Sequence, residues 1–385
     1  MRRCEHDSVL RVLQSLHGGG QAVSPALTAL NLRYCNGIAS PPESIIGQLP
    51  ALKSLQLSWC RDLTDLPDSL GQLTALTALQ MAACARVARL PDSLGQLTSL
   101  LALDLSDCAA LTALPELACQ LTALVELDMH GCVGLTHLPE ALGDLCALTH
   151  LNLSDCGQLE RLPDSLGQLT ALRTLRLAGC TALTALPASA WQLSSLTALN
   201  LAGCQALSAL PELLGELTAL RQLQLSGCAR VARLPDSLGQ LASLTLLDAT
   251  GCCALTRLPE SLGGLAALTT LNLHHCAALT GLPESLGQLA SLSLRELCLD
   301  RCASLGPVPE ALRQQLRGLP LLRDGGGSCS APAPPRVPLS AEAMEKLIRD
   351  HHRMHAEVAA TVRTSDAIIR EQRDSAADRL AALFH

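Results

Sequence analysis

Cysteine offers this 385-residue chain its widest choice of chemistry, because eighteen thiols could form disulfides, bind zinc or act as nucleophiles. Zinc sites built from short motifs need paired C-x-x-C spacing. Only Cys252–Cys253 and Cys298…Cys302 lie close together in the sequence, and neither pair matches a recognised ligand pattern. We therefore predict no metal ligand and no cofactor. Twelve of the cysteines recur at regular intervals instead, which predicts a structural row of buried thiols.

Histidines near carboxylates are the next candidates, as general bases or metal ligands. The best pairs are His130 with Asp128, and His150 with Glu126, which would be lateral neighbours able to form an ion pair. The two histidines would lie roughly 13 Å apart along the strands, too far apart to share a metal ion. No serine or cysteine on this face has both a base and an orienting carboxylate in register. We predict that the protein is not an enzyme.

The element that must position these residues is a repeat, LxxLxLxxCxxLxxLPxxLGxLxx, which is mostly 24 residues long and starts at Leu27. Its cysteines are Cys35, Cys60, Cys84, Cys108, Cys132, Cys156, Cys180, Cys204, Cys228, Cys252, Cys276 and Cys302. Alternating leucines predict a strand with one buried face, with Leu100, Leu103, Leu105, Leu111 and Leu114 inward in one unit. A proline seven residues after each cysteine ends the strand segment. The Asp/Glu-Ser that follows suits a capped helical turn, and a glycine there permits a tight exit. Because no unit can bury its apolar face alone, the units must stack around one continuous core.

Cysteine at the position where many such repeats have asparagine, followed by LxxLPxSLGxL, carries a resemblance to a known family. Residues 27 to about 318 resemble the leucine-rich repeats of plant disease-resistance receptors, and they are similar to those of intracellular Ras-associated scaffolds. The resemblance implies an α/β repeat solenoid, a horseshoe with a parallel β-sheet on its concave side and irregular or 3₁₀ segments on its convex side. It also implies a protein-binding scaffold in signalling or defence. No GxxxxGK[ST] motif is present, so the nucleotide-driven switch of the receptors is not implied.

Composition and charge exclude other classes of partner. A net charge of −7 does not suit binding to nucleic acid phosphates, and the four aromatic residues offer few side chains on which bases could stack. No stretch approaches the roughly 20 apolar residues that span a bilayer, and early charged residues interrupt any signal-peptide core. We expect a cytoplasmic protein with reduced thiols that binds neither nucleic acid nor membrane.

The sequence divides into four predicted segments. They are an N-terminal helical cap (1–26), the twelve-repeat solenoid (27–318), a Gly/Pro-rich linker (319–338) and a C-terminal helix (339–385). An unbroken helix there would be roughly 66 Å long, so it either breaks near Ser365 or pairs with another helix as a coiled coil. Self-association through this helix gives the alternative function, a structural or assembly protein. A third possibility is an enzyme activity in the tail, such as ubiquitin transfer through Cys329, although no folded catalytic domain surrounds that residue.

A protein partner, not identified by the sequence, is expected to contact four groups of residues on the concave face. They are an aromatic pair (Tyr34, Trp59), an acidic zone (Asp104, Asp107, Glu126, Asp128, Asp155), a basic island (Arg173, Arg176, Arg221) and a second cationic area (His274, His275, Arg295, Arg301). Aromatic residues and arginine are the usual hot spots of interfaces. The alternative is that the charged side chains only solvate an exposed sheet.

Overall fold

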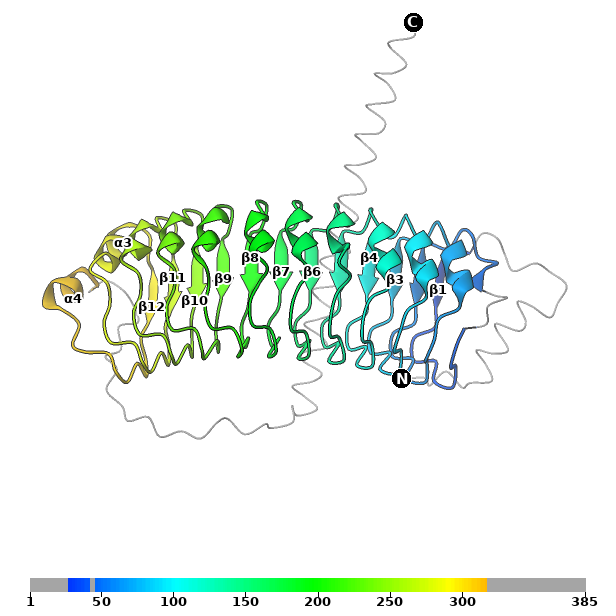
Figure 1. The fold of residues 1–385 in the computed structure, drawn as a ribbon, viewed down its shortest axis with the longest axis horizontal. Helices are drawn as coiled ribbons and strands as arrows, with labels where there is room; N and C mark the ends of the chain where they lie inside the picture. The colour runs from blue at the N-terminus through cyan, green and yellow to red at the C-terminus, as the bar shows by residue number, and fades with distance from the viewer. Residues whose placement is uncertain (1–26, 42–45, 317–385) are drawn as a thin grey trace, which may run out of the picture. The chain divides into compact units, whose positions relative to one another are not determined.

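The computed structural model describes residues 27–41 and 46–316, which form a solenoid of stacked repeats (Figure 1). Its twelve strands form one parallel sheet in sequence order. The strands are β1 (Ala29–Asn31), β2 (Ser54–Gln56), β3 (Ala78–Gln80), β4 (Ala102–Asp104), β5 (Glu126–Asp128), β6 (His150–Asn152), β7 (Thr174–Arg176), β8 (Ala198–Asn200), β9 (Gln222–Gln224), β10 (Leu246–Asp248), β11 (Thr270–Asn272) and β12 (Glu296–Cys298). The segments predicted at 1–26, 319–338 and 339–385 lie outside the described residues.

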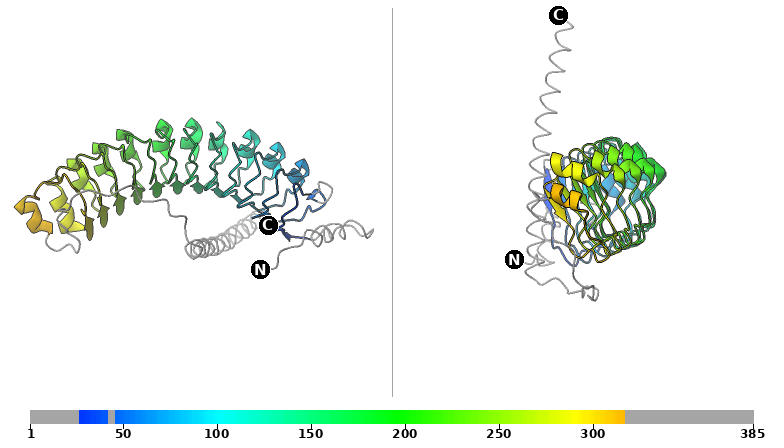
Figure 2. Two further views of the ribbon diagram at one scale, coloured as in Figure 1. Left: turned by 90° about the horizontal axis from the view of Figure 1, so that it is seen from below. Right: turned by 90° about the vertical axis from the view of Figure 1, so that its left-hand side faces the viewer.

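Short helices alternate with the strands. The 3₁₀ helices are η1 (Asp68–Gln72), η2 (Asp92–Gln96), η3 (Glu116–Gln120), η4 (Leu142–Asp144), η5 (Asp164–Gln168), η6 (Ala188–Gln192), η7 (Glu212–Glu216), η8 (Asp236–Gln240) and η9 (Glu260–Gly264). Two α-helices follow, α3 (Leu286–Leu292) and α4 (Glu310–Leu316). Figure 2 shows the strands along the inner side of the curved solenoid and the helices along its outer side. The predicted fold class is confirmed for the repeats.

The proline before each 3₁₀ helix ends the extended segment, as predicted, but the helix that follows lacks the predicted side-chain cap. Pro91 precedes η2 in an extended conformation, with φ −70° and ψ 148°, so it ends the preceding extended segment. The expected side-chain cap is absent in η1–η9. Asp92 is instead the first helical residue, where its charge lies near the positive end of the turn.

The glycine of the helical turn brings neighbouring repeats together. A Cβ atom added to Gly95 would collide with the backbone carbonyl of Leu117 in the next repeat. Gly95 does not have a positive φ angle. The expected role in a tight exit is therefore wrong at this position, and the missing side chain serves close packing between repeats.

The core is the stack of inward leucines and cysteines from every repeat. Leu103 and Leu105 are buried on either side of Asp104, as the alternation predicted, and Leu100, Leu111 and Leu114 are buried with them. The same positions are occupied by buried apolar residues in the neighbouring repeats. Because each layer is covered by the next, burial runs through the whole described solenoid.

Candidate functional site

The twelve repeated cysteines form a ladder inside the solenoid, called the cysteine ladder below. Eleven of the thiols lie 3.1–3.3 Å from a backbone carbonyl oxygen of the preceding repeat, as Cys180 does with Leu153. Burial raises the pKa of Cys84 and Cys228 to about 11. The thiols therefore remain protonated and donate hydrogen bonds, whereas a nucleophile or a metal ligand must be a thiolate. The predicted structural role of the ladder is confirmed.

In seven of the twelve strands, the side chain of the last strand residue accepts a hydrogen bond from the backbone of the following turn. Asp128 Oδ1 accepts the N–H of His130 at 2.9 Å, and Asp104 Oδ1 accepts the N–H of Ser106 at 3.0 Å. The same bond occurs at Asn31, Asn152, Asn200, Asp248 and Asn272. Such bonds stabilise the turn that follows the strand.

This backbone bonding affects the acidic zone, because Asp104 and Asp128 are half-buried and directed at their own turns. Burial and the nearby charge of Asp104 raise the pKa of Asp128, against the hydrogen bond from His130, which lowers it. The two carboxylates lie on paired strands, as predicted. They are less accessible to a partner than the zone's residues in the turns.

A second column appears three residues after each strand, called the left-handed column below. It consists of Tyr34, Trp59, Ala83, Asp107, Gly131, Asp155, Gly179, Gly203, Gly227, Gly251, His275 and Arg301, with φ between +56° and +75°. Glycine adopts this conformation without strain, whereas other residues are disfavoured there. The pattern of leucines does not predict this column, although glycine directly precedes the cysteine in five repeats.

Six of the fourteen predicted contact residues belong to the left-handed column, at the end of the strands and not on their faces. Asp and His tolerate the conformation better than most side chains do. Tyr34, Trp59 and Arg301 do not have that tolerance. Backbone strain of this kind is typical of functional positions.

Tyr34 and Trp59 stack on one another, with ring centroids 6.0 Å apart. Tyr34 is 51% exposed. The Arg33 guanidinium lies 5.4 Å from the Tyr34 ring centroid, and that of Arg61 lies 5.9 Å from the Trp59 ring centroid. The structure thus brings the predicted aromatic pair together and adds two arginines to it.

In the turns of the acidic zone, Asp107 and Asp155 are exposed on either side of Gly131. The Asp155 carboxylate lies 3.6 Å from His130 Nδ1. The imidazole of His130 thus contacts Asp155, whereas its backbone N–H donates to Asp128. Glu126 and His150 are paired residues of β5 and β6, as the register predicted.

His150 is held in place by its neighbour Thr149. Its Nδ1 lies 2.7 Å from Thr149 Oγ1, while that hydroxyl donates to the Val125 carbonyl at 3.1 Å. The single hydroxyl proton is therefore used, and the imidazole must donate to Thr149. Partial burial, then the charges of Arg176 and Arg173, lower the pKa of His150.

The basic island is divided between the two ends of short strands. Arg173 and Arg221 directly precede β7 and β9, whereas Arg176 ends β7. Arg173 and Arg221 occupy equivalent positions two strands apart, which corresponds to roughly 10 Å across the sheet. All three side chains are exposed, and none forms a salt bridge within residues 27–41 and 46–316.

The second cationic area is not one cluster. Arg295 precedes β12, and Arg301 follows the other end of that strand. The rings of His274 and His275 lie 6.3 Å apart, and the His275 N–H donates to the Asp300 carbonyl at 2.8 Å. His274 lies beside Cys298 and Asp300. His275 and Arg301 hold equivalent positions in adjacent turns, so Arg295 is the member that lies apart.

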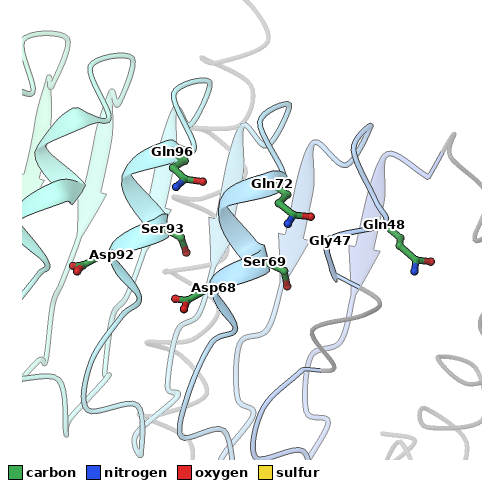
Figure 3. Close-up of a pocket in the computed structure, with 8 residues that line it drawn as sticks. All are labelled: Gly47, Gln48, Asp68, Ser69, Gln72, Asp92, Ser93 and Gln96. Atoms are coloured by element: carbon green, nitrogen blue, oxygen red, sulfur yellow. The ribbon is translucent and has the colours of Figure 1, made fainter.

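A polar pocket on the helical side is a product of the repeat. It is lined by Gly47, Gln48, Asp68, Ser69, Gln72, Asp92, Ser93 and Gln96. Figure 3 shows Gln48, Gln72 and Gln96 in a row over three successive repeats. Because this pattern follows the helical turns and their packing glycines, it indicates packing between repeats and not a distinct site.

Comparisons with known proteins agree with the geometry. Residues 127–229 match the model of a leucine-rich repeat region. The crystal structure of a TDR receptor is similar, with 25% identity and a TM-score of 0.55, over 78% of this chain and 52% of that chain. Toll from the Drosophila Toll–Spatzle complex has 21% identity and a TM-score of 0.51, over 71% of this chain and 41% of that chain.

The leucine-rich repeat domain of the type III effector XopL has 24% identity and a TM-score of 0.47, over 71% of this chain and 90% of that chain. This chain spans about half the length of the TDR receptor chain. None of the curated proteins matches the sequence. Within the described part of the chain, no helix has the length and apolar character to cross a membrane. The repeats are leucine-rich repeats, as the resemblance implied.

Proposed function

We propose that this leucine-rich repeat protein is a non-enzymatic scaffold that binds a protein partner along its concave sheet and the adjoining turns. The leucine-rich repeat fold is a typical scaffold for protein–protein interaction. The observation that carries the proposal is the left-handed column. Seven of its twelve positions have a residue other than glycine, although glycine there removes the strain.

The order of the contact groups along the sheet indicates the length and charge pattern of the partner's surface. The aromatic pair lies at β1 and β2, the acidic zone at β4–β6 and the basic island at β7–β9. At about 4.8 Å per strand, β1 and β9 are roughly 38 Å apart. We infer a partner surface of that length, with an apolar or anionic end for the aromatic pair and its arginines. A basic patch and then an acidic patch would follow.

The cellular setting is also part of the proposal. The resemblance supports a signalling or defence role in the cytoplasm. Within the described residues, no disulfide links any of the sixteen cysteines, which supports a reducing compartment.

Affinity capture with the full chain tests the contact surface. The double variant Arg173→Glu/Arg176→Glu reverses charge on exposed side chains outside the left-handed column, and Asp107→Asn/Asp155→Asn removes charge while asparagine still tolerates the backbone. We expect either change to reduce capture of the wild-type partner at least tenfold. Arg89→Glu, an exposed residue of a return segment, is the matched control and should keep the partner. Unchanged capture by both concave variants contradicts the proposal.

A second proposal is self-association through residues 339–385, which is supported by apolar residues recurring at three- or four-residue steps. Light scattering of the full chain and of a 1–323 truncation tests it. A smaller assembly is expected for the truncation, and an unchanged size eliminates this alternative.

A further inference from the structure

We infer that the last two strands of the sheet carry a binding site for a zinc-class transition-metal ion, formed by His274, Cys298 and Asp300. Their possible ligand atoms, an imidazole nitrogen, a thiol sulfur and a carboxylate oxygen, all lie within 4.8 Å of one another. The three residues come from two repeats, so stacking of the solenoid assembles the site. The inference goes beyond the proposed function, since it does not depend on the identity of a protein partner.

Parallel register brings the three residues together. Cys298 ends β12 and is paired with Asn272, the last residue of β11. His274 and Asp300 each follow the strand end by two residues, so they hold equivalent places in adjacent turns. The His274 N–H donates to Asn272 Oδ1 at 3.1 Å, which holds the first of these turns in place. The backbone bond from His275 to Asp300 joins it to the second.

The spacing fits tetrahedral coordination. Zinc binds sulfur at about 2.3 Å and nitrogen or oxygen at about 2.0–2.2 Å, so ligand atoms of one ion lie roughly 3.5 Å apart. Cys298 Sγ and Asp300 Oδ2 are 3.8 Å apart. Ligand atoms that lie within 4.8 Å of one another must move closer by roughly 1 Å to surround an ion.

The donor types select the class of metal. A thiolate with an imidazole and one carboxylate suits zinc and its neighbours among the transition metals, whereas magnesium and calcium prefer oxygen ligands alone. All three residues are half-buried. An ion can therefore enter from solvent, and its fourth position stays open to water or to a side chain of a partner.

Cys298 is the thiol of the last repeat that is available for this role. The ladder residue Cys302 is buried and donates to the Leu273 carbonyl at 3.2 Å. At the strand-end position of Cys298, the other eleven repeats have Asn, Gln, Asp or Arg. Repeat five has a histidine two residues after its strand, His130, but no thiol at the strand end beside it. The complete donor set thus occurs only once in the described solenoid.

Cobalt(II) titration of the reduced, chelator-treated full-length protein tests the site. We expect a thiolate-to-cobalt charge-transfer band that saturates at one equivalent and is displaced by zinc. Cys298→Ser should abolish the band, and His274→Gln or Asp300→Asn should weaken binding at least tenfold. Cys253→Ser removes an exposed thiol from the neighbouring repeat and should retain the band. Circular dichroism confirms that each variant is folded.

Two results overturn the inference. One is a folded wild-type protein that gives no thiolate–cobalt band. The other is a band that survives Cys298→Ser, because the ligands then lie elsewhere in the chain. Partner capture with the arginine variants measures the proposed function separately, so failure of one does not imply failure of the other.

Discussion

The cysteine ladder makes stability unusually sensitive to alkaline pH. Burial raises the pKa of Cys84 and Cys228 from 9.0 to about 11, and that of Cys156, Cys180 and Cys276 to about 12. The pKa of each of these thiols is higher in the folded state than in the unfolded state. Their contribution to the free energy of unfolding is therefore fully present below pH 9, and it is lost as the pH rises toward 11–12. Between pH 8 and 10 an unfolded thiol ionises while the folded thiol does not. The loss is about 1 kcal/mol for each thiol.

Summed over the ladder, the loss amounts to several kcal/mol if the solenoid unfolds as one unit, which is comparable with the whole stability of a typical domain. Urea unfolding followed by circular dichroism at pH 8 and pH 10, with a reductant present, measures the loss.

A single variant isolates one thiol. Cys84→Ala should reduce the difference in unfolding free energy between pH 8 and pH 10 by about 1 kcal/mol relative to wild type. Cys146→Ala, which removes a thiol outside the ladder, should leave that difference unchanged. Equal pH dependence in wild type and Cys84→Ala would refute the assignment of the alkaline loss to the ladder.

Three further predictions concern packing, charge and thiol access. Gly95→Ala should lower the unfolding free energy by about 1–3 kcal/mol in urea titrations, because the new Cβ collides with backbone of the next repeat. Gly157→Ala, with its nearest neighbour at 3.6 Å, should stay within about 0.5 kcal/mol of wild type, and equal effects would contradict the packing role. Asp128→Asn should raise the free energy of unfolding at pH 7. The pKa of the Asp128 carboxyl is raised in the folded state, so its ionisation destabilises the fold as the pH increases. A variant that is less stable than wild type at pH 7 would count against this. Cys146 and Cys253 should be alkylated in the native protein and the ladder only after unfolding, as mass spectrometry can show.

The number of strands and the orientation of their side chains followed from the 24-residue spacing, because each strand repeats one short alternation of apolar and polar residues. The inward position of Leu103 and the burial of Cys108 needed only that alternation and the need to cover an apolar face. The grouping of Tyr34 with Trp59 also followed, since parallel strands in register place equivalent residues side by side.

Other features depended on contacts that no single repeat contains. The role of Gly95 is set by a carbonyl of the next repeat. The bond from His130 to Asp128 and the left-handed backbone at Asp107 belong to a turn whose shape the pattern of leucines does not specify. Arg295 and Arg301 are close in the sequence, yet they lie at opposite ends of one strand.

The sequence by itself determined that the repeats form a solenoid, because a unit with one apolar face can be covered only by its neighbours. It also determined that the ladder thiols are structural, since they recur once in every unit. Only the tertiary structure decided which polar residues meet. His274, Cys298 and Asp300 satisfy no ligand motif, yet the parallel pairing of β11 and β12 brings their donor atoms within 4.8 Å. The physical reason is that neighbours across a sheet are one repeat apart in sequence and one strand spacing apart in space.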